Sequence, residues 1–176
     1  MIRYYVTDRS QGDVLTYARR AIAAGVDMVQ IREKDLSARQ LLELVCQVRD
    51  LAAGTSTRIL VNDRLDIALA AGVDGVHLPA NGLPPARVRP FAKVLGVSTH
   101  TLQEAVEAEQ ARSDFIVFGP VFDTPGKTPV GLDVLREVAS RVKIPVLAIG
   151  GITLENTQEA LNAGAAGIAG IRLFQR

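Results

Sequence analysis

The sequence has 176 residues, of which 48% are hydrophobic and 22% charged, and its formal net charge is +1. This length favours one domain with a sizeable core, which we expect over residues 1–176. The near-zero charge argues against a nucleic-acid-binding surface built on bulk charge, and no apolar run reaches the roughly 18 residues of a membrane span. We therefore expect neither a nucleic acid nor a membrane as a partner.

Two features predict a cytoplasmic location. The N-terminus, MIRYYVTDRS, has the pattern of a strand and not of the apolar segment of a signal peptide. The single cysteine, Cys46, cannot form an internal disulfide, which fits a reducing compartment. The sequence also has no CxxC, HExxH, GxxxxGK[ST] or GxSxG motif, which excludes the usual metal-thiolate, zincin, P-loop and hydrolase sites.

Short β-branched runs alternate with helix patterns along the whole chain. Similar segments at 23–31 (AAGVDMVQI), 70–78 (AAGVDGVHL) and 162–171 (NAGAAGIAGI) each end a helix pattern on Gly and then enter a strand. The sequence predicts strands at roughly 3–7, 28–32, 58–62, 75–79, 94–98, 115–119, 145–149 and 167–172. It predicts helices at roughly 12–24, 37–53, 64–71, 85–92, 101–112, 131–142 and 153–163.

Three of the predicted helices have an N-cap signal. Ser37, Thr101 and Thr153 stand at the expected first positions. Gln40 and Glu104, three residues after the first two, complete a capping box.

Strict alternation of strands and helices predicts parallel strands and an α/β fold. Eight strands favour a closed (β/α)8 TIM barrel, with an open doubly wound sheet as the alternative. The chain is short for a barrel, for which about 250 residues is typical, and it lacks room for a last helix after residue 172. Either the chain is clipped or a partner subunit covers the gap, so a homodimer is a hypothesis.

The stretch VQIREKD raises the question of function. Gln30, Arg32 and Lys34 share one face of a predicted strand. A strand inside a closed barrel has no solvent-facing side, so we expect these groups to point into the upper lumen. The alternative is a purely structural pairing of Arg32 with a lumen carboxylate such as Asp63.

Active sites of such barrels lie at the carboxyl ends of the strands. Cations, amides and glycines gather at these ends, which suits a phosphorylated ligand. Asp63 beside Asn62 is a candidate Mg²⁺ ligand, although the pair also has the pattern of a helix N-cap. His77 and His100 are either core residues or acid–base groups; Asp8, Glu33 and Asp123 are interpreted as solvated loop charges.

The strand-end residues, in this order, resemble the superfamily of thiamine phosphate synthase and TenI (thiazole tautomerase). The matching stretches are VQIREKD, LVNDRLDIALAAGVDGVHL, GVSTH, FGPVFDTPGK and IPVLAIGGIT, and they span nearly the whole chain. Such a synthase joins hydroxymethylpyrimidine diphosphate to thiazole phosphate and releases pyrophosphate with the help of Mg²⁺. The implied partners are these two small phosphorylated substrates.

The resemblance implies roles for particular residues. The catalytic residues would be Arg32, Lys34 and Lys127, whose positive charges would stabilise the diphosphate and the pyrophosphate that leaves. Asp63 would hold Mg²⁺. The expected substrate-binding residues are Gln30, Asn62, Ser98, His100, Thr124, Gly150, Gly151 and Arg172.

Some positions depart from the family pattern. Gly82 stands where a second acidic Mg²⁺ ligand is usual, Gly126 replaces a Thr, and Arg172 replaces a phosphate-binding Ser. A TenI-like tautomerase needs no metal, which makes it one alternative; its pattern has a His where this chain has Pro120. A non-catalytic binder of a thiazole or pyrimidine phosphate is the other. The intact Gln-x-Arg-x-Lys and Asn-Asp pairs favour the synthase.

Overall fold

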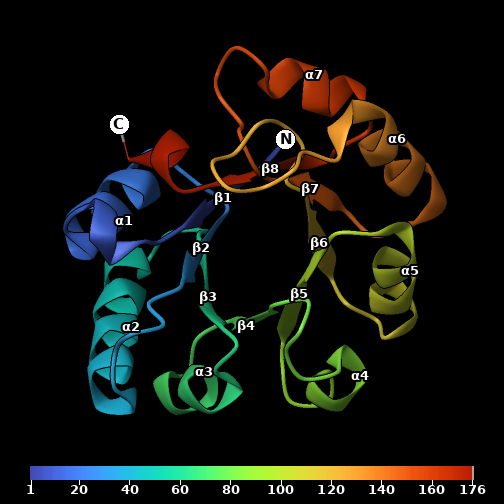
Figure 1. Cartoon of the computed structure of the whole chain (residues 1–176). Helices are drawn as coiled ribbons and strands as arrows, with labels where there is room; N and C mark the ends of the chain where they lie inside the picture. Colours follow the sequence, from blue (N-terminus) through green and yellow to red (C-terminus); the bar gives the residue numbers. More distant parts are fainter. Residues whose placement is uncertain (176) are drawn as a thin grey trace.

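The computed structural model describes residues 1–175 and is a closed barrel of parallel strands in the order β1 to β8 (Figure 1). β1 pairs with β8, with Ile2 opposite Gly167, and this pairing closes the sheet. The TIM-barrel prediction is confirmed and the open sheet is excluded. The strands are Ile2–Val6, Met28–Ile31, Arg58–Asn62, Gly75–Leu78, Val94–Thr99, Phe115–Phe118, Val146–Ala148 and Gly167–Gly170.

The helices cover the outside of the barrel (Figure 1). They are α1 (Val14–Ala23), α2 (Ala38–Ala52), α3 (Leu65–Ala71), α4 (Pro85–Val88), α5 (Leu102–Gln110), α6 (Gly131–Arg141) and α7 (Thr157–Asn162). Within the described residues, a 3₁₀ helix at Arg172–Phe174 is the only helix after β8. None of the helices in residues 1–175 is long and apolar enough to cross a membrane.

The predicted helices overrun the observed ones by a few residues, and two of them, 85–92 and 153–163, do so by four residues or more. α4 ends at Val88 because Pro90 has no N–H with which to continue the helix, although Arg89 itself still has helical backbone angles. α7 begins at Thr157, so Thr153 is not its N-cap. Thr153 and Asn156 instead bond to each other, through Thr153 N to Asn156 Oδ1 (2.8 Å) and Asn156 N to Thr153 Oγ1 (3.3 Å). The capping boxes predicted at Ser37 and Thr101 are confirmed.

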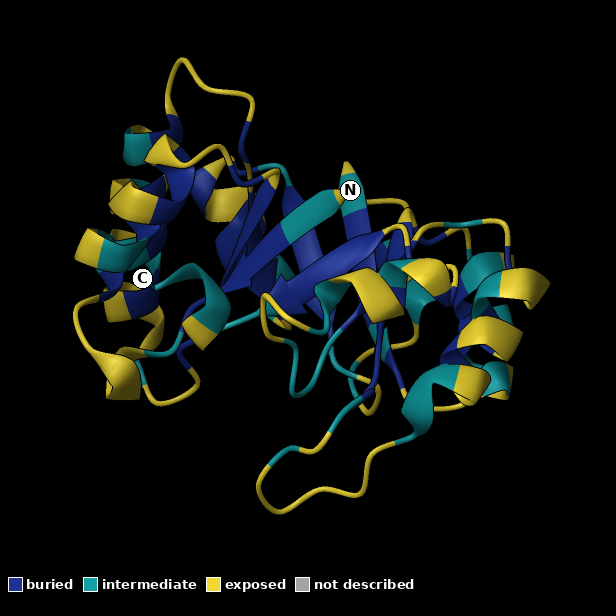
Figure 2. Cartoon of the chain, turned by 90° about the horizontal axis from the view of Figure 1, so that it is seen from above, coloured by how far each residue is buried: buried dark blue, intermediate teal, exposed yellow. Residues whose placement is uncertain are grey.

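Alternation along the strands separates the lumen from the outer core. Val29 and Ile31 pack outward among helix residues, while Met28 belongs to a separate cluster inside the barrel. Figure 2 shows the buried strands enclosed by helices whose outer faces are exposed. The lumen cluster consists of Tyr4, Met28, Leu60, Phe115, Val117, Leu147 and Ala169. It forms an apolar floor beneath the carboxyl ends of the strands.

Gly96 on β5 leaves room for two rings in the lumen. A Cβ there would lie 2.4 Å from Phe115 Cζ and 2.7 Å from His77 Nδ1, and both distances are shorter than non-bonded atoms adopt. Phe115 packs edge-on against Tyr4 with the ring centroids 5.4 Å apart. The absence of a side chain at residue 96 therefore sets where the His77 ring lies.

We expect Gly96→Ala to lower the free energy of unfolding by about 1–3 kcal/mol, the usual cost of overpacking a core. Gly170→Ala is the matched control, because its Cβ would meet nothing closer than Leu173 Cβ at 3.4 Å. Urea unfolding followed by circular dichroism measures both. Equal stability of the two variants would show that the lumen around His77 is not tightly packed.

Candidate functional site

The carboxyl ends of β2, β3 and β4 surround a cavity of about 360 Å³. Lys34, Asn62 and Asp63, three of the residues that the sequence singles out, line it together. Asn81 and Pro79 from the loop after β4 complete this side. Asn81 was not anticipated; the only signal is its place in HLPANG, directly after a strand. The other lining residues are Ile31, Glu33, Leu36, Leu41 and Arg64. The cavity therefore combines two cations, two carboxylates and two amides with apolar side chains.

Asp63 has an unusual backbone conformation. Its φ is 60°, in the region that favours glycine. Its N–H donates to the carbonyl oxygen of His77 (2.8 Å), and Arg64 N donates to Asn62 O across it (2.7 Å), which makes a tight three-residue turn. The N-cap interpretation of Asp63 is wrong, because Arg64 occupies that position and α3 has no side-chain cap. The turn instead leaves the Asp63 carboxylate at the cavity.

Gly82 lies directly against this carboxylate. A Cβ on Gly82 would be 3.0 Å from Asp63 Oδ1 and 2.9 Å from Pro79 Cδ. Within the described part of the chain, no group of three or more His, Cys, Asp or Glu side chains is placed to hold a metal ion. The side-chain oxygens that line the cavity belong to Glu33, Asn62, Asp63 and Asn81, and those of Glu33 already accept hydrogen bonds from Thr7 and Arg9.

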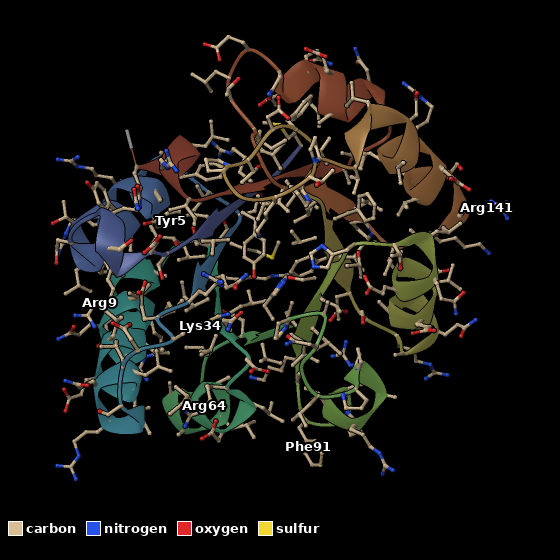
Figure 3. All side chains as sticks on the ribbon, in the orientation of Figure 1. Tyr5, Arg9, Lys34, Arg64, Phe91 and Arg141 are labelled. Carbon is tan, nitrogen blue, oxygen red and sulfur yellow. The ribbon has the colours of Figure 1, made fainter. Side chains whose placement is uncertain are left out.

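The groups of VQIREKD divide between the lumen and its rim. Gln30 is buried, and its Nε2 donates to the Tyr4 hydroxyl (3.0 Å). The Arg32 guanidinium lies near enough to His77 to help lower that residue's pKa. Lys34 is exposed at the cavity, inside the ring of helices (Figure 3). Among residues 1–175, no ion pair joins Arg32 to Asp63, so the structural pairing is not found.

Glu33 fixes the loop that carries these cations. It is 5% exposed and accepts hydrogen bonds from Thr7 Oγ1 (2.6 Å) and Arg9 N (3.0 Å). Thr7 Oγ1 in turn accepts from Arg32 N (3.0 Å). The interpretation of Glu33 as a solvated charge is wrong; the Thr7–Glu33 clamp joins the loop after β1 to the loop after β2. The sequence does contain a hint of this role, because Glu33 lies between Arg32 and Lys34 and so points to the opposite face of the strand from these two cations.

His77 lies inside the barrel and is 1% exposed. Its Nδ1 lies 3.3 Å from the Tyr4 hydroxyl and its Nε2 lies 2.8 Å from Ser98 Oγ. Burial, together with the positive charge of Arg32, lowers the pKa of His77 to about 3. The imidazole is therefore neutral, and it is a hydrogen-bonded interior residue. The sequence did not predict a role for Tyr4. Its position next to the outward-facing Tyr5 on a strand indicates that its side chain points into the lumen.

His100 is exposed at the end of β5. Its Nδ1 donates to the carbonyl oxygen of Gly119 at 2.6 Å, since a carbonyl can only accept. This bond leaves the other ring nitrogen, Nε2, to face the rim. His100 lies away from the residues that line the cavity.

Thr124 and Lys127 lie on the segment between β6 and α6, which extends beyond the barrel as an exposed loop (Figure 2). Lys127 N donates to Thr124 O (3.0 Å), and Thr124 Oγ1 donates to Phe122 O (3.1 Å). The two residues are held near each other by this turn. Neither lines the cavity at β2 to β4.

Gly150 and Gly151 follow β7 with φ values of 92° and 64°. A Cβ on Gly151 would lie 2.5 Å from Asp123 O, so the loop after β6 approaches β7 closely here. In the described chain, neither glycine N–H donates a hydrogen bond to another residue. Arg172 is exposed and begins the 3₁₀ helix after β8. These residues follow the neighbouring strands β7 and β8, and none of them lines the cavity.

Comparisons with known proteins show what this chain is similar to. The family described as thiamine monophosphate synthase matches residues 3–174. A thiamine-phosphate synthase of Methanocella arvoryzae is 45% identical over 176 residues, which cover 94% of this chain and 83% of that protein. One of Chloroflexus aurantiacus is 43% identical over 155 residues, covering 85% and 72%.

A solved structure extends the likeness to three dimensions. Thiamine phosphate pyrophosphorylase from Pyrococcus furiosus is similar with a TM-score of 0.90 and 36% sequence identity, over 97% of this chain and 85% of that one. The resemblance read from the strand ends is confirmed: this chain belongs to the thiamine monophosphate synthase family.

Proposed function

We propose that this chain is a thiamine phosphate synthase, a transferase that joins hydroxymethylpyrimidine diphosphate to thiazole phosphate and releases pyrophosphate. The observation that carries the proposal is the meeting of Lys34, Asn62 and Asp63 around one cavity at the carboxyl ends of the strands. The synthase names of the relatives at 43% and 45% identity favour this activity over a tautomerase or a non-catalytic binder.

The diphosphate binds beside the cations that follow β2. Arg32 and Lys34 donate charge-assisted hydrogen bonds to its oxygens, with Asn62 beside them. The bond between the pyrimidine methylene carbon and the diphosphate oxygen breaks, and its electron pair leaves with pyrophosphate. The lone pair of the thiazole nitrogen then forms the new carbon–nitrogen bond. Fixed cations stabilise the negative charge that develops on the leaving group, so no strong base is required.

The oxygen donors at Asp63 fit Mg²⁺ that is shared with the substrate. Mg²⁺ is often held by one or two carboxylates together with substrate phosphates and water. Asp63 would supply the carboxylate, with the amide oxygens of Asn62 and Asn81 beside it. When bound, Mg²⁺ neutralises charge on the departing pyrophosphate. With Gly82 in place of a second acid, Asp63 depends on the diphosphate to complete the site.

The thiazole phosphate binds at the ends of β7 and β8. The N–H groups of Gly150 and Gly151 donate no hydrogen bond within the described chain, and Arg172 adds a charge after the neighbouring strand β8. From the loop after β6, Thr124 and Lys127 donate to the departing pyrophosphate, and His100 contacts substrate at the rim. We also propose that the enzyme is a cytoplasmic homodimer without a nucleic-acid or membrane partner.

The proposal is tested by incubating the chain with both phosphorylated halves, with and without Mg²⁺. We expect thiamine phosphate and pyrophosphate to appear only with Mg²⁺. Aromatisation of a thiazole carboxylate phosphate without added metal would identify a tautomerase instead. Ligand-induced shifts in melting temperature without either turnover would identify a binder.

Lys127→Ala should lower kcat about 100-fold or more, because it removes a cation that stabilises the leaving charge. Lys143→Ala is the matched control, since Lys143 is exposed just before β7, at the opposite end of the barrel. Steady-state kinetics with both substrates measures the two variants. Similar rates for Lys127→Ala and the unaltered chain would remove Lys127 from the mechanism.

Comparison of Asp63→Gly with Asp63→Ala separates the effect of the carboxylate on Mg²⁺ binding from the effect of backbone strain on stability. Both should weaken Mg²⁺ binding in the presence of pyrophosphate at least tenfold, measured by calorimetry. The glycine variant should be more stable than the alanine variant by about 1 kcal/mol, because only glycine adopts a φ of 60° without strain. Equal stability of the two variants would contradict a strained turn, and unchanged Mg²⁺ binding would contradict the metal site.

A further inference from the structure

An unbroken series of hydrogen bonds crosses the lumen from β2 to β5. Gln30 Nε2 lies 3.0 Å from the Tyr4 hydroxyl, which lies 3.3 Å from His77 Nδ1. His77 Nε2 lies 2.8 Å from Ser98 Oγ. The first three side chains are 3%, 0% and 1% exposed, whereas Ser98 is only half-buried. Ser98 is therefore the end of the series that is accessible from outside the lumen.

The series has a direction. The Gln30 amide nitrogen can only donate, so the Tyr4 oxygen accepts from it and the Tyr4 hydrogen remains free. The next acceptor for that hydrogen is Nδ1 of His77. A neutral imidazole carries one hydrogen, so Nδ1 as an acceptor leaves the hydrogen on Nε2. Nε2–H then donates to Ser98 Oγ.

The surroundings keep the imidazole neutral. It is enclosed by the Tyr4 and Phe115 rings, with centroids 5.7 Å and 5.9 Å from its own. The charged group that acts on it in this part of the lumen is the Arg32 guanidinium, which opposes a second proton. The Tyr4 hydroxyl is buried and stays protonated, since burial raises its pKa. No member of the series gains or loses charge near neutral pH.

We propose that Tyr4 and His77 are positioning residues that hold the Ser98 hydroxyl with its hydrogen directed towards the bound diphosphate substrate. Because Ser98 Oγ already accepts from Nε2–H, its own hydrogen is free to be donated, and a donor is what an anionic ligand requires. In the opposite tautomer, Nε2 would accept the Ser98 hydrogen, and Ser98 Oγ would present only lone pairs to the anion. The inference rests on the proposed function only in that Ser98 contacts the diphosphate substrate.

The tautomer is measured directly on the unaltered chain. Nitrogen NMR of protein labelled at its two histidines distinguishes Nδ1–H from Nε2–H, and the exposed His100 is assigned by its loss in His100→Asn. We expect His77 to be the neutral Nε2–H form from pH 5 to pH 8. The Nδ1–H form, or titration in this range, would overturn the proposal. This result does not depend on turnover, so failure of the synthase assay leaves it intact.

A double-mutant cycle tests the effect on the ligand. Tyr4→Phe should weaken binding of hydroxymethylpyrimidine diphosphate, without thiazole phosphate, by about 3- to 10-fold, and Ser98→Ala by about 10-fold. In the Ser98→Ala background, Tyr4→Phe should have no further effect. Tyr5→Phe is the matched control, because it removes the next hydroxyl from the same strand on the outer face, where its partner is Gln175.

Three outcomes of the double-mutant cycle would contradict the proposal. Additive effects of Tyr4→Phe and Ser98→Ala would mean that Tyr4 acts independently of Ser98, which overturns the positioning role. Unchanged affinity in Ser98→Ala would overturn the contact on which the inference rests, even if turnover persists. Loss of affinity in Tyr5→Phe equal to that in Tyr4→Phe would indicate general destabilisation and not orientation of Ser98.

Discussion

The interior of the closed barrel admits little water, so every polar group there needs a partner within the protein. An unpaired buried amide, hydroxyl or imidazole costs several kcal/mol in an apolar medium. Gln30, Tyr4 and His77 meet this requirement by bonding to one another above the apolar layer that contains Leu60 and Leu147. The site is therefore built on a floor whose polar groups are already satisfied, and only the groups at its edge are left for a ligand.

At the edge of the cavity, the backbone at Asp63 is strained, which lowers the stability of the fold. Asp63 takes a backbone conformation that a helix cap would not need, and α3 begins without a side-chain cap. Strain of this kind costs of order 1–3 kcal/mol and persists where the surroundings enforce it. Here the bond from Asp63 N to His77 O, between neighbouring strands, enforces it. The same strand pair thus fixes both the carboxylate at the cavity and the imidazole in the lumen.

The barrel was predictable because its signals are local: alternation, glycine helix ends and capping boxes all repeat along the chain. The meeting of Lys34 with Asp63 also followed, since parallel strands bring their carboxyl ends to one face. What the sequence did not predict depends on residues distant in the chain. Glu33 is buried because Thr7 and Arg9 reach it from another loop, and Asp63 leaves the cap because of a bond from another strand. Neither partner can be identified from spacing alone.

The Thr7–Glu33 clamp holds the loop after β1 and the loop after β2 together. Thr7 Oγ1 both donates to the Glu33 carboxylate and accepts from Arg32 N, and the Arg9 side chain pairs with Asp35 at 3.0 Å. The cations after β2 are thereby anchored to the segment that leads into α1. The loops after β1 and β2 are thus cross-linked by side chains, whereas the loop between β6 and α6 extends from the barrel with most of its residues exposed (Figure 2). Of these loops, the one after β6 is therefore the freer to change its conformation.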